Sequence, residues 1–160
     1  MLTTRPLAVF DIDGVLADVA HRVHHLEGRK NWGAFFAAAP RDGVHPQGRE
    51  LVVEAAVDCD IAYVTGRPEW CRADTASWLR RHGLPAGVLA MRRNGDHRPA
   101  RHAKLRLLRE LARARTVAIV VDDDPDVCDA YEQAGFAVLR ATWAIRSDAL
   151  HTAQEEDGRT

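Results

Sequence analysis

Two aspartates separated by one residue, Asp11 and Asp13, have the clearest potential for chemistry in this chain of 160 residues. They follow an apolar run at residues 7–10 and precede Gly14, in the sequence LAVFDIDGVL. An apolar run of this kind is typical of a strand buried on both faces, and a glycine allows a sharp turn after it. Two carboxylates this close do not ionise together readily without a cation, so the pair indicates a metal ion or a shared proton. The alternative is an ordinary turn with solvated acids, because Asp and Gly are common turn residues.

A phosphate-binding turn is indicated by Thr65, Gly66 and Arg67, which directly follow the apolar segment DIAYV. We expect Pro68 to open a helix immediately afterwards. A hydroxyl group and free backbone N–H groups at a strand-to-helix turn suit a phosphate oxygen. A Thr-Gly pair is also common in loops that bind nothing, so this motif alone assigns no function.

Two further signals stand at the ends of predicted elements. Lys104 lies at the start of an apolar helix stripe, where an unpaired ammonium rarely points toward the core; a lysine that extends its amine to solvent is the alternative. Asp122, Asp123 and Asp124 follow the apolar segment VAIVV. Three acids at the end of a buried strand are costly without a counter-ion. The alternative is that only Asp124 matters, as the N-cap of the next helix.

The elements that must position these residues alternate along the chain. We expect strands at residues 6–10, 60–64, 117–121 and 136–140, a weaker one at 87–91, and helices at 68–82, 101–114 and from Asp124 to Gly135. This alternation predicts an α/β fold with three Rossmann-like layers, in which about five parallel strands carry helices on both faces. Ligands gather at the carboxyl ends of such strands, where the motifs above would meet. Residues 17–46 lack a strong strand, and we expect them to form a small cap or flap over the carboxylates.

Composition favours one globular domain over residues 1–160, with 46% hydrophobic and 28% charged residues. We expect residues 147–160 to be a frayed helix or a flexible tail. The net charge of −1 does not favour a generally basic protein that coats nucleic acid. The stretch from Arg92 to Arg115 nevertheless holds nine Lys or Arg and two acids, which indicates a basic face or simply a solvated helix.

Three cysteines without ligand spacing, and the lack of a long apolar segment or signal sequence, predict a cytoplasmic protein with no membrane association. The sequence indicates no particular oligomeric state.

Taken in order, the motifs resemble those of the haloacid dehalogenase (HAD) superfamily of phosphohydrolases over residues 7–140. This resemblance implies that Asp11 is a nucleophile that forms an aspartyl-phosphate, and that Asp13 is the general acid and base. It also implies a Mg²⁺ ion held by the Asp11 carboxylate, the Asp13 backbone carbonyl and Asp122, with Asp123 nearby.

The same resemblance implies that Thr65 and the backbone amide of Gly66 hold phosphoryl oxygens, and that Lys104 neutralises charge between the nucleophile and the phosphate. An acid at position 13 favours phosphatase chemistry over dehalogenation. A HAD-fold protein that only binds a partner is an alternative of another class, because fold alone does not assign function.

Finer details resemble the 3′-phosphatase module of bacterial and phage polynucleotide kinase-phosphatases. These are Arg22, eleven residues after Asp11, the pair Met91-Arg92, and the stretch GDHR before Lys104. The resemblance implies that Arg22, Arg67 and Arg92 contact substrate phosphates. It further implies a role in nucleic-acid repair on 3′-phosphate ends of DNA or RNA, with a separate kinase or ligase as partner, since the chain has no GxxxxGK[ST] motif. A phosphatase of nucleotides or sugar phosphates is the alternative.

Two positions depart from the pattern of this module. Ala100 stands where the family often has an acid, and Asp124 stands where it commonly has an arginine.

Overall fold

The computed structural model describes residues 4–160 of the protein. Within these residues, five parallel strands form one sheet in the order β5-β4-β1-β6-β7. The strands are β1 (Leu7–Phe10), β4 (Asp60–Pro68), β5 (Gly87–Arg92), β6 (Val117–Asp122) and β7 (Val138–Arg140). The predicted α/β fold, including the weaker strand at 87–91, is confirmed. Because β1 lies at the centre, Asp11 leaves the sheet between β4 and β6.

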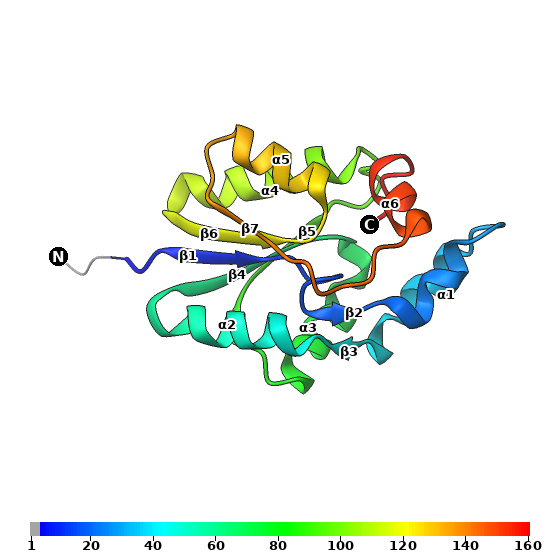
Figure 1. Cartoon of the computed structure of the whole chain (residues 1–160), viewed down its shortest axis with the longest axis horizontal. Helices are drawn as coiled ribbons and strands as arrows, with labels where there is room; N and C mark the ends of the chain where they lie inside the picture. Colours follow the sequence, from blue (N-terminus) through cyan, green and yellow to red (C-terminus); the bar gives the residue numbers. More distant parts are fainter. Residues whose placement is uncertain (1–3) are drawn as a thin grey trace.

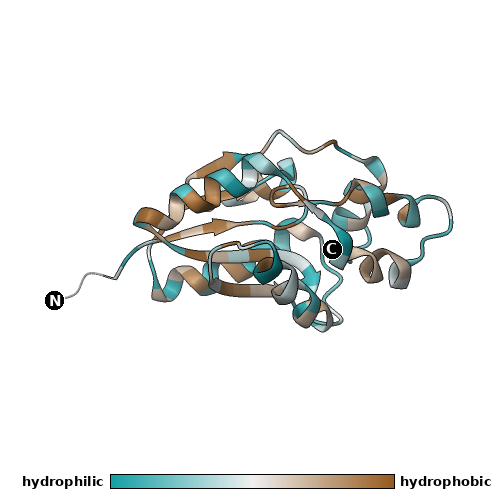
Figure 2. Cartoon of the chain, turned by 90° about the horizontal axis from the view of Figure 1, so that it is seen from below, coloured by the Kyte–Doolittle hydropathy of each residue, from teal (hydrophilic) through white to brown (hydrophobic). Residues whose placement is uncertain are grey.

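Helices cover both faces of the sheet. In Figure 1, α4 (Ala100–Ala114) and α5 (Pro125–Gln133) lie above it, and α2 (Pro46–Asp58) and α3 (Arg72–Arg81) lie below it. The surfaces of these helices carry both polar and apolar residues, while the strands are largely apolar (Figure 2). This pattern is that of a three-layer domain with amphipathic outer helices.

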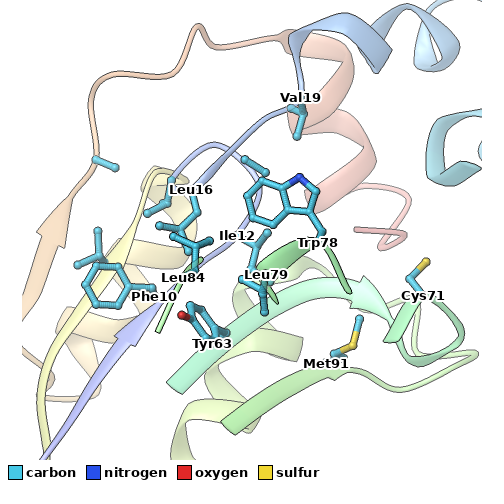
Figure 3. Close-up of a cluster of buried hydrophobic side chains, with 14 of the residues drawn as sticks. Phe10, Ile12, Leu16, Val19, Tyr63, Cys71, Trp78, Leu79, Leu84 and Met91 are labelled. Atoms are coloured by element: carbon cyan, nitrogen blue, oxygen red, sulfur yellow. The ribbon is translucent and has the colours of Figure 1, made fainter. Parts of the chain in front are cut away.

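Strand β1 is buried on both faces because its side chains alternate between two cores. Ala8 and Phe10 join one cluster of buried hydrophobic residues, and Leu7 and Val9 join the other. Figure 3 shows the first cluster, where Phe10 lies among side chains such as Tyr63 and Leu84. A strand packed in this way is a rigid base for the acids that follow it.

The predicted cap is a compact excursion between β1 and α2. It contains β2 (Ala17–Asp18), η1 (Ala20–Leu26), α1 (Trp32–Ala37), η2 (Ala39–Arg41) and β3 (Gly43–Val44). The two short strands pair antiparallel and close the excursion at its base. Phe35 and Phe36 are 0% and 4% exposed, so these aromatic side chains anchor the cap to the core.

Three local features differ from the sequence expectations. Strand β4 continues through Thr65, Gly66 and Arg67 to Pro68, with a register shift against β5. The predicted helix start at Pro68 is therefore wrong: Pro68 has an extended backbone, a short 3-10 turn η3 (Glu69–Cys71) follows, and α3 begins at Arg72.

Helix α2 was not anticipated, whereas a helix within residues 147–160 was one of the two expected alternatives. Residues Asp148–Glu155 form helix α6, whose inward residues Ala153 and Gln154 are 0% and 6% exposed. No helix within residues 4–160 is long and apolar enough to cross a membrane.

Candidate active site

An acidic cluster lies where β1 and β6 end side by side. Asp11 follows β1, Asp122 ends β6, and Asp123 comes next in the chain. One ligand atom from each of the three carboxylates lies within 4.8 Å of the others. Asp11 and Asp122 are 2% and 1% exposed, so the parallel sheet brings together acids that are more than one hundred residues apart in sequence.

Lys104 points from α4 into this cluster. Its Nζ lies 3.0 Å from Asp11 Oδ2 and 2.9 Å from Asp122 Oδ2, and the residue is 2% exposed. The ammonium is thus buried between two carboxylates and does not extend to solvent. Burial alone would lower the pKa of Lys104, but the two carboxylates raise it well above its usual value, which keeps the amine charged.

One ammonium does not balance three carboxylates. Burial and the neighbouring acids raise the pKa of Asp11 well above its ordinary value and that of Asp123 to about 7. Oδ1 of Asp123 is buried and has no hydrogen-bond partner among the described residues, and Oδ2 of Asp11 has no contact there beyond its ion pair with Lys104. A set of carboxylate oxygens with unused acceptors fits Mg²⁺, which prefers oxygen ligands.

Gly14 permits the close approach of Asp123 to the loop after β1. Its φ is +85°, and a Cβ at this position would lie 2.2 Å from Asp123 Oδ2. A side chain here would be strained and would displace the carboxylate. The sharp turn predicted at Gly14 is present, and the residue also makes room for the third acid.

Asp13 has a different environment from Asp11. Its Oδ1 accepts hydrogen bonds from Arg67 Nη2 at 2.5 Å and from Arg22 Nη2 at 3.1 Å. Burial raises the pKa of Asp13, but Arg67 and Arg22 outweigh this effect and lower the pKa to about 2. The interpretation that one cation or one proton serves both acids does not describe the Asp13 side chain, because two arginines neutralise it.

Asp42, which sequence reasoning missed, holds both arginines in place. Its carboxylate accepts from Nε and Nη2 of Arg22 at 2.8 and 2.9 Å, and from Arg67 Nη2 at 3.0 Å. The ring of His21 lies 2.7 Å away, and the Asp42 carbonyl accepts from Trp78 Nε1 at 2.9 Å. Asp42 is 2% exposed, so the cap contributes a buried anion to the core of the site.

Arg22 keeps one group available for a ligand. Its Nη1 is buried and has no hydrogen-bond partner within residues 4–160, and the guanidinium lies over the ring of Phe35 at 4.3 Å. Thr65, which is 1% exposed, accepts from the Arg67 backbone N–H at 3.2 Å. Thr65 and Arg67 therefore sit together on the end of β4, beside the acids that follow β1.

Arg92 is turned toward backbone carbonyls rather than toward the acids. It donates to Gly66 O at 3.0 Å, Arg98 O at 2.7 Å and Thr160 O at 3.1 Å. In this arrangement it ties the end of β4 to the loop after β5 and to the C-terminal residue. The structure does not bring its guanidinium into the cluster of Asp13, Arg22 and Arg67.

The basic stretch between β5 and β6 divides into two groups. Arg92 and Lys104 are buried, whereas Arg93 and Arg98 are exposed and lie within ion-pair distance of acids. Ala100, at the start of α4, is fully buried, so no acid supports Lys104 from that position.

A cavity of about 370 Å³ lies between the cap and the segment that precedes α6. Gly14 and Asp123 line this cavity together with His24, His45 and Arg146, so it reaches the third acid of the cluster.

A family model described as the polynucleotide kinase PNKP phosphatase domain matches residues 6–143 of the chain. This match covers the five strands, the cap, the acidic cluster with Lys104, and the group of Asp13, Arg22, Asp42 and Arg67. No curated protein was found to match the sequence.

Several solved structures share the fold. A chain of the Pnkp1/Rnl/Hen1 RNA repair complex is 20% identical, with a TM-score of 0.72 over 89% of this chain and 44% of that one. A haloacid dehalogenase-like hydrolase from Streptococcus pneumoniae is 14% identical, with a TM-score of 0.62 over 94% of this chain and 90% of that one. A HAD hydrolase from Bacillus subtilis bound to magnesium is 10% identical, with a TM-score of 0.60 over 94% and 98%. The protein thus spans less than half of the repair-complex chain that it resembles.

Proposed function

The chain belongs to the HAD superfamily, in the family of polynucleotide kinase PNKP phosphatase domains, and on this basis we propose that it is a Mg²⁺-dependent phosphomonoesterase. The observation that carries the proposal is the buried cluster of three carboxylates and Lys104 at the ends of β1 and β6. We further propose that its substrates are 3′-phosphate ends of nucleic acid.

The proposed reaction assigns to Asp11 and Asp13 the roles that the family resemblance implies. A carboxylate oxygen of Asp11 forms a bond to phosphorus while the bond to the leaving oxygen breaks, and that oxygen takes a proton from Asp13. Water then adds to phosphorus, Asp13 accepts its proton, and the bond from phosphorus to Asp11 breaks. The products are the free alcohol, inorganic phosphate and the original carboxylate.

Other residues hold the phosphoryl group during these steps. Lys104 balances charge between the nucleophile and the phosphoryl oxygens, and the Thr65 hydroxyl with the Gly66 amide donates to them. Mg²⁺, when held by Asp11, Asp122, Asp123 and the Asp13 carbonyl, would supply positive charge that offsets the phosphate.

The arginines support a substrate with more than one phosphate. Arg22 Nη1 has no partner among the described residues, and Arg67 stands beside it through their shared contacts with Asp13 and Asp42. A guanidinium binds phosphate with two parallel hydrogen bonds. We propose that this pair binds the terminal phosphate or the adjoining phosphodiester; Arg92, which donates to backbone carbonyls, supports the end of β4 instead.

A panel of substrates tests the proposal. With Mg²⁺ present, the protein should release phosphate from a 3′-phosphorylated oligonucleotide faster than from nucleoside monophosphates or sugar phosphates. The opposite ranking would favour a small-molecule phosphatase and refute the nucleic-acid substrate. DNA and RNA oligonucleotides of the same sequence would separate those two substrates.

The variant Asp11→Asn tests whether the protein is an enzyme at all. We expect it to fold and to release no phosphate from any member of the panel. If the wild type is equally inactive on the whole panel, the alternative of a HAD-fold binding protein gains support. A separate kinase or ligase partner is part of the proposal, and the neighbour in the Pnkp1/Rnl/Hen1 RNA repair complex, which is assembled with other proteins, supports a partner of some kind. Co-purification from the native cell extract would test it.

A further inference from the structure

A second group of metal-binding side chains lies behind the acids of the active site, between α5 and α6. Asp124, Asp126 and His151 each offer one ligand atom, and these atoms lie within 4.8 Å of one another. Asp124 and Asp126 belong to the start of α5, and His151 belongs to α6. Helix α6 lies beyond residues 6–143, which match the family model, so this group combines the shared core with a segment outside the match.

One buried oxygen of this group, and one of the neighbouring Glu155, lack a donor. Asp124 is 2% exposed and Glu155 is 8% exposed. Oδ2 of Asp124 and Oε1 of Glu155 have no hydrogen-bond donor within the described part of the chain. The two carboxyl groups contact each other, and two buried carboxyl groups in contact require a shared proton or a cation. Since buried acceptors in proteins are nearly always satisfied, these oxygens point to a missing ligand.

The neighbouring charges do not satisfy these oxygens. Asp124 Oδ1 accepts from the Asp126 backbone N–H at 2.9 Å, as the N-cap of α5. The other oxygen of Glu155 pairs with Arg101. His151 Nε2 lies 2.8 Å from Asp126 Oδ2, and both side chains are about two-fifths exposed, at 41% and 44%. The group therefore has a buried acidic floor and a half-exposed imidazole and carboxylate through which an ion can enter from solvent.

We propose that Asp124, Asp126 and His151, with Glu155 behind them, bind a divalent transition-metal ion such as Zn²⁺. An imidazole nitrogen with carboxylate oxygens suits Zn²⁺ better than Mg²⁺, which prefers oxygen and retains water. The active-site group of Asp11, Asp122 and Asp123 offers only carboxylate oxygens as ligands, so the two sites differ in the ion that they select. Asp123 faces the active-site group and Asp124 the second group.

The ion would fasten α6 to the catalytic core. Helix α6 packs against both α4 and η1 of the cap, and in Figure 1 it lies at the carboxyl end of the sheet, close to the cap. A ligand from α6 and two from α5 would therefore hold one wall of the 370 Å³ cavity, which His151 also lines. The proposal does not depend on which phosphate ester is hydrolysed.

Calorimetric titration of the full chain with Zn²⁺ in excess Mg²⁺ tests this site. We expect one Zn²⁺ per chain, and a loss of affinity of at least ~10-fold in His151→Gln and in Asp126→Asn. His102→Gln, which changes an exposed histidine on α4, is the matched control and should bind as the wild type does. Zn²⁺ should raise the melting temperature of the wild type and of the control, and not that of His151→Gln.

Two outcomes would overturn the proposal. If the wild type binds no Zn²⁺ in excess Mg²⁺, the buried carboxyl pair has no metal partner. If Zn²⁺ binding persists in His151→Gln and disappears in Asp11→Asn, the ion occupies the active-site group of Asp11, Asp122 and Asp123 instead. Melting curves of each variant without metal show whether a loss of binding is due to unfolding.

Discussion

Replacement of Asp42 by Asn should destabilise the protein far more than an ordinary loss of one surface charge. The Asp42 carboxylate accepts two hydrogen bonds from Arg22 and one from Arg67, at 2.8 to 3.0 Å, and its side chain is 0% exposed. An amide in this position offers one acceptor and turns an N–H₂ group toward a guanidinium. The variant would leave buried positive charge with fewer acceptors, which is more costly than losing a favourable contact alone.

The size of the effect follows from what remains around the arginines. Breaking a buried ion pair by removing one partner costs about 3–5 kcal/mol. Arg22 still has Asp13 at 3.1 Å, so we expect the lower end of this range, about 3 kcal/mol. At roughly 2–4 °C per kcal/mol for a domain of this size, the melting temperature should fall by about 6–12 °C. Displacement of Arg22 and Arg67 should also lower kcat/KM by roughly 100-fold.

Asp129→Asn is the matched control, because it makes the same substitution in an exposed Asp–Arg pair. Asp129 and Arg140 are 57% and 41% exposed, and such a pair contributes less than about 1 kcal/mol. Urea unfolding followed by circular dichroism, together with phosphate release, compares the two variants. If Asp42→Asn loses no more stability than Asp129→Asn, the buried carboxylate does not hold the arginines as we argue.

Four further predictions concern the active-site acids and the residues in contact with them. Asp11→Asn should abolish phosphate release while the far-ultraviolet circular dichroism stays unchanged; residual turnover would refute the assignment of the nucleophile. Lys104→Met should lower kcat/KM by about 10²–10³-fold, and a near-normal rate would show that its charge is dispensable. The pKa of Asp123 is about 7 in the folded protein against 3.8 for a free side chain, so without Mg²⁺ stability should fall as pH rises from about 4 to about 7, and Mg²⁺ should raise the melting temperature more at pH 8 than at pH 5. Gly14→Ala should weaken Mg²⁺ binding by about 10-fold in a calorimetric titration, because the new Cβ displaces Asp123; unchanged affinity would place the ion away from Asp123.

The residues that sequence analysis could identify share one property: each stands at the end of a strongly patterned element. Asp11 and Asp122 follow apolar strands, and Lys104 interrupts the buried stripe of an amphipathic helix. In a parallel α/β sheet, those ends meet at one edge whatever the loops do. Residue type and strand order therefore sufficed to place these three side chains together.

Asp42 could not be found in this way. It lies in the turn-rich segment RDGV, where an aspartate reads as a turn residue. Its partners Arg22 and Arg67 are 20 and 25 residues away, and the contact depends on the path of the cap. Only the three-dimensional course of residues 17–46 shows that the carboxylate is buried.

Helix α2 was missed for a different physical reason. Its inward face carries Leu51, Val52, Ala55 and Ala56, which pack on the core. Val53 and Val57 are apolar too but are 49% and 74% exposed, so the sequence does not distinguish the buried face from the outer one. A glycine also lowers helix propensity by about 1 kcal/mol relative to alanine. Here it is required, since a Cβ at Gly48 would lie 1.9 Å from the Val15 carbonyl oxygen. The close packing that demands a glycine is the same feature that weakens the helical signal.

Asp11 and Asp13 lie in opposite electrostatic environments, because burial raises the pKa of Asp11, whereas Arg67 and Arg22 lower that of Asp13 to about 2. A cation held by Asp11 would favour its ionised form, which is the form that attacks phosphorus in the proposed reaction. Asp13 is ionised in the resting protein, which suits the step in which it accepts a proton from water. To donate a proton first, it must lose part of its contact with the arginines. Arg22 and Arg67 are also the proposed partners of substrate phosphate, so their movement toward the substrate would raise the pKa of Asp13 at the moment when it has to act as an acid.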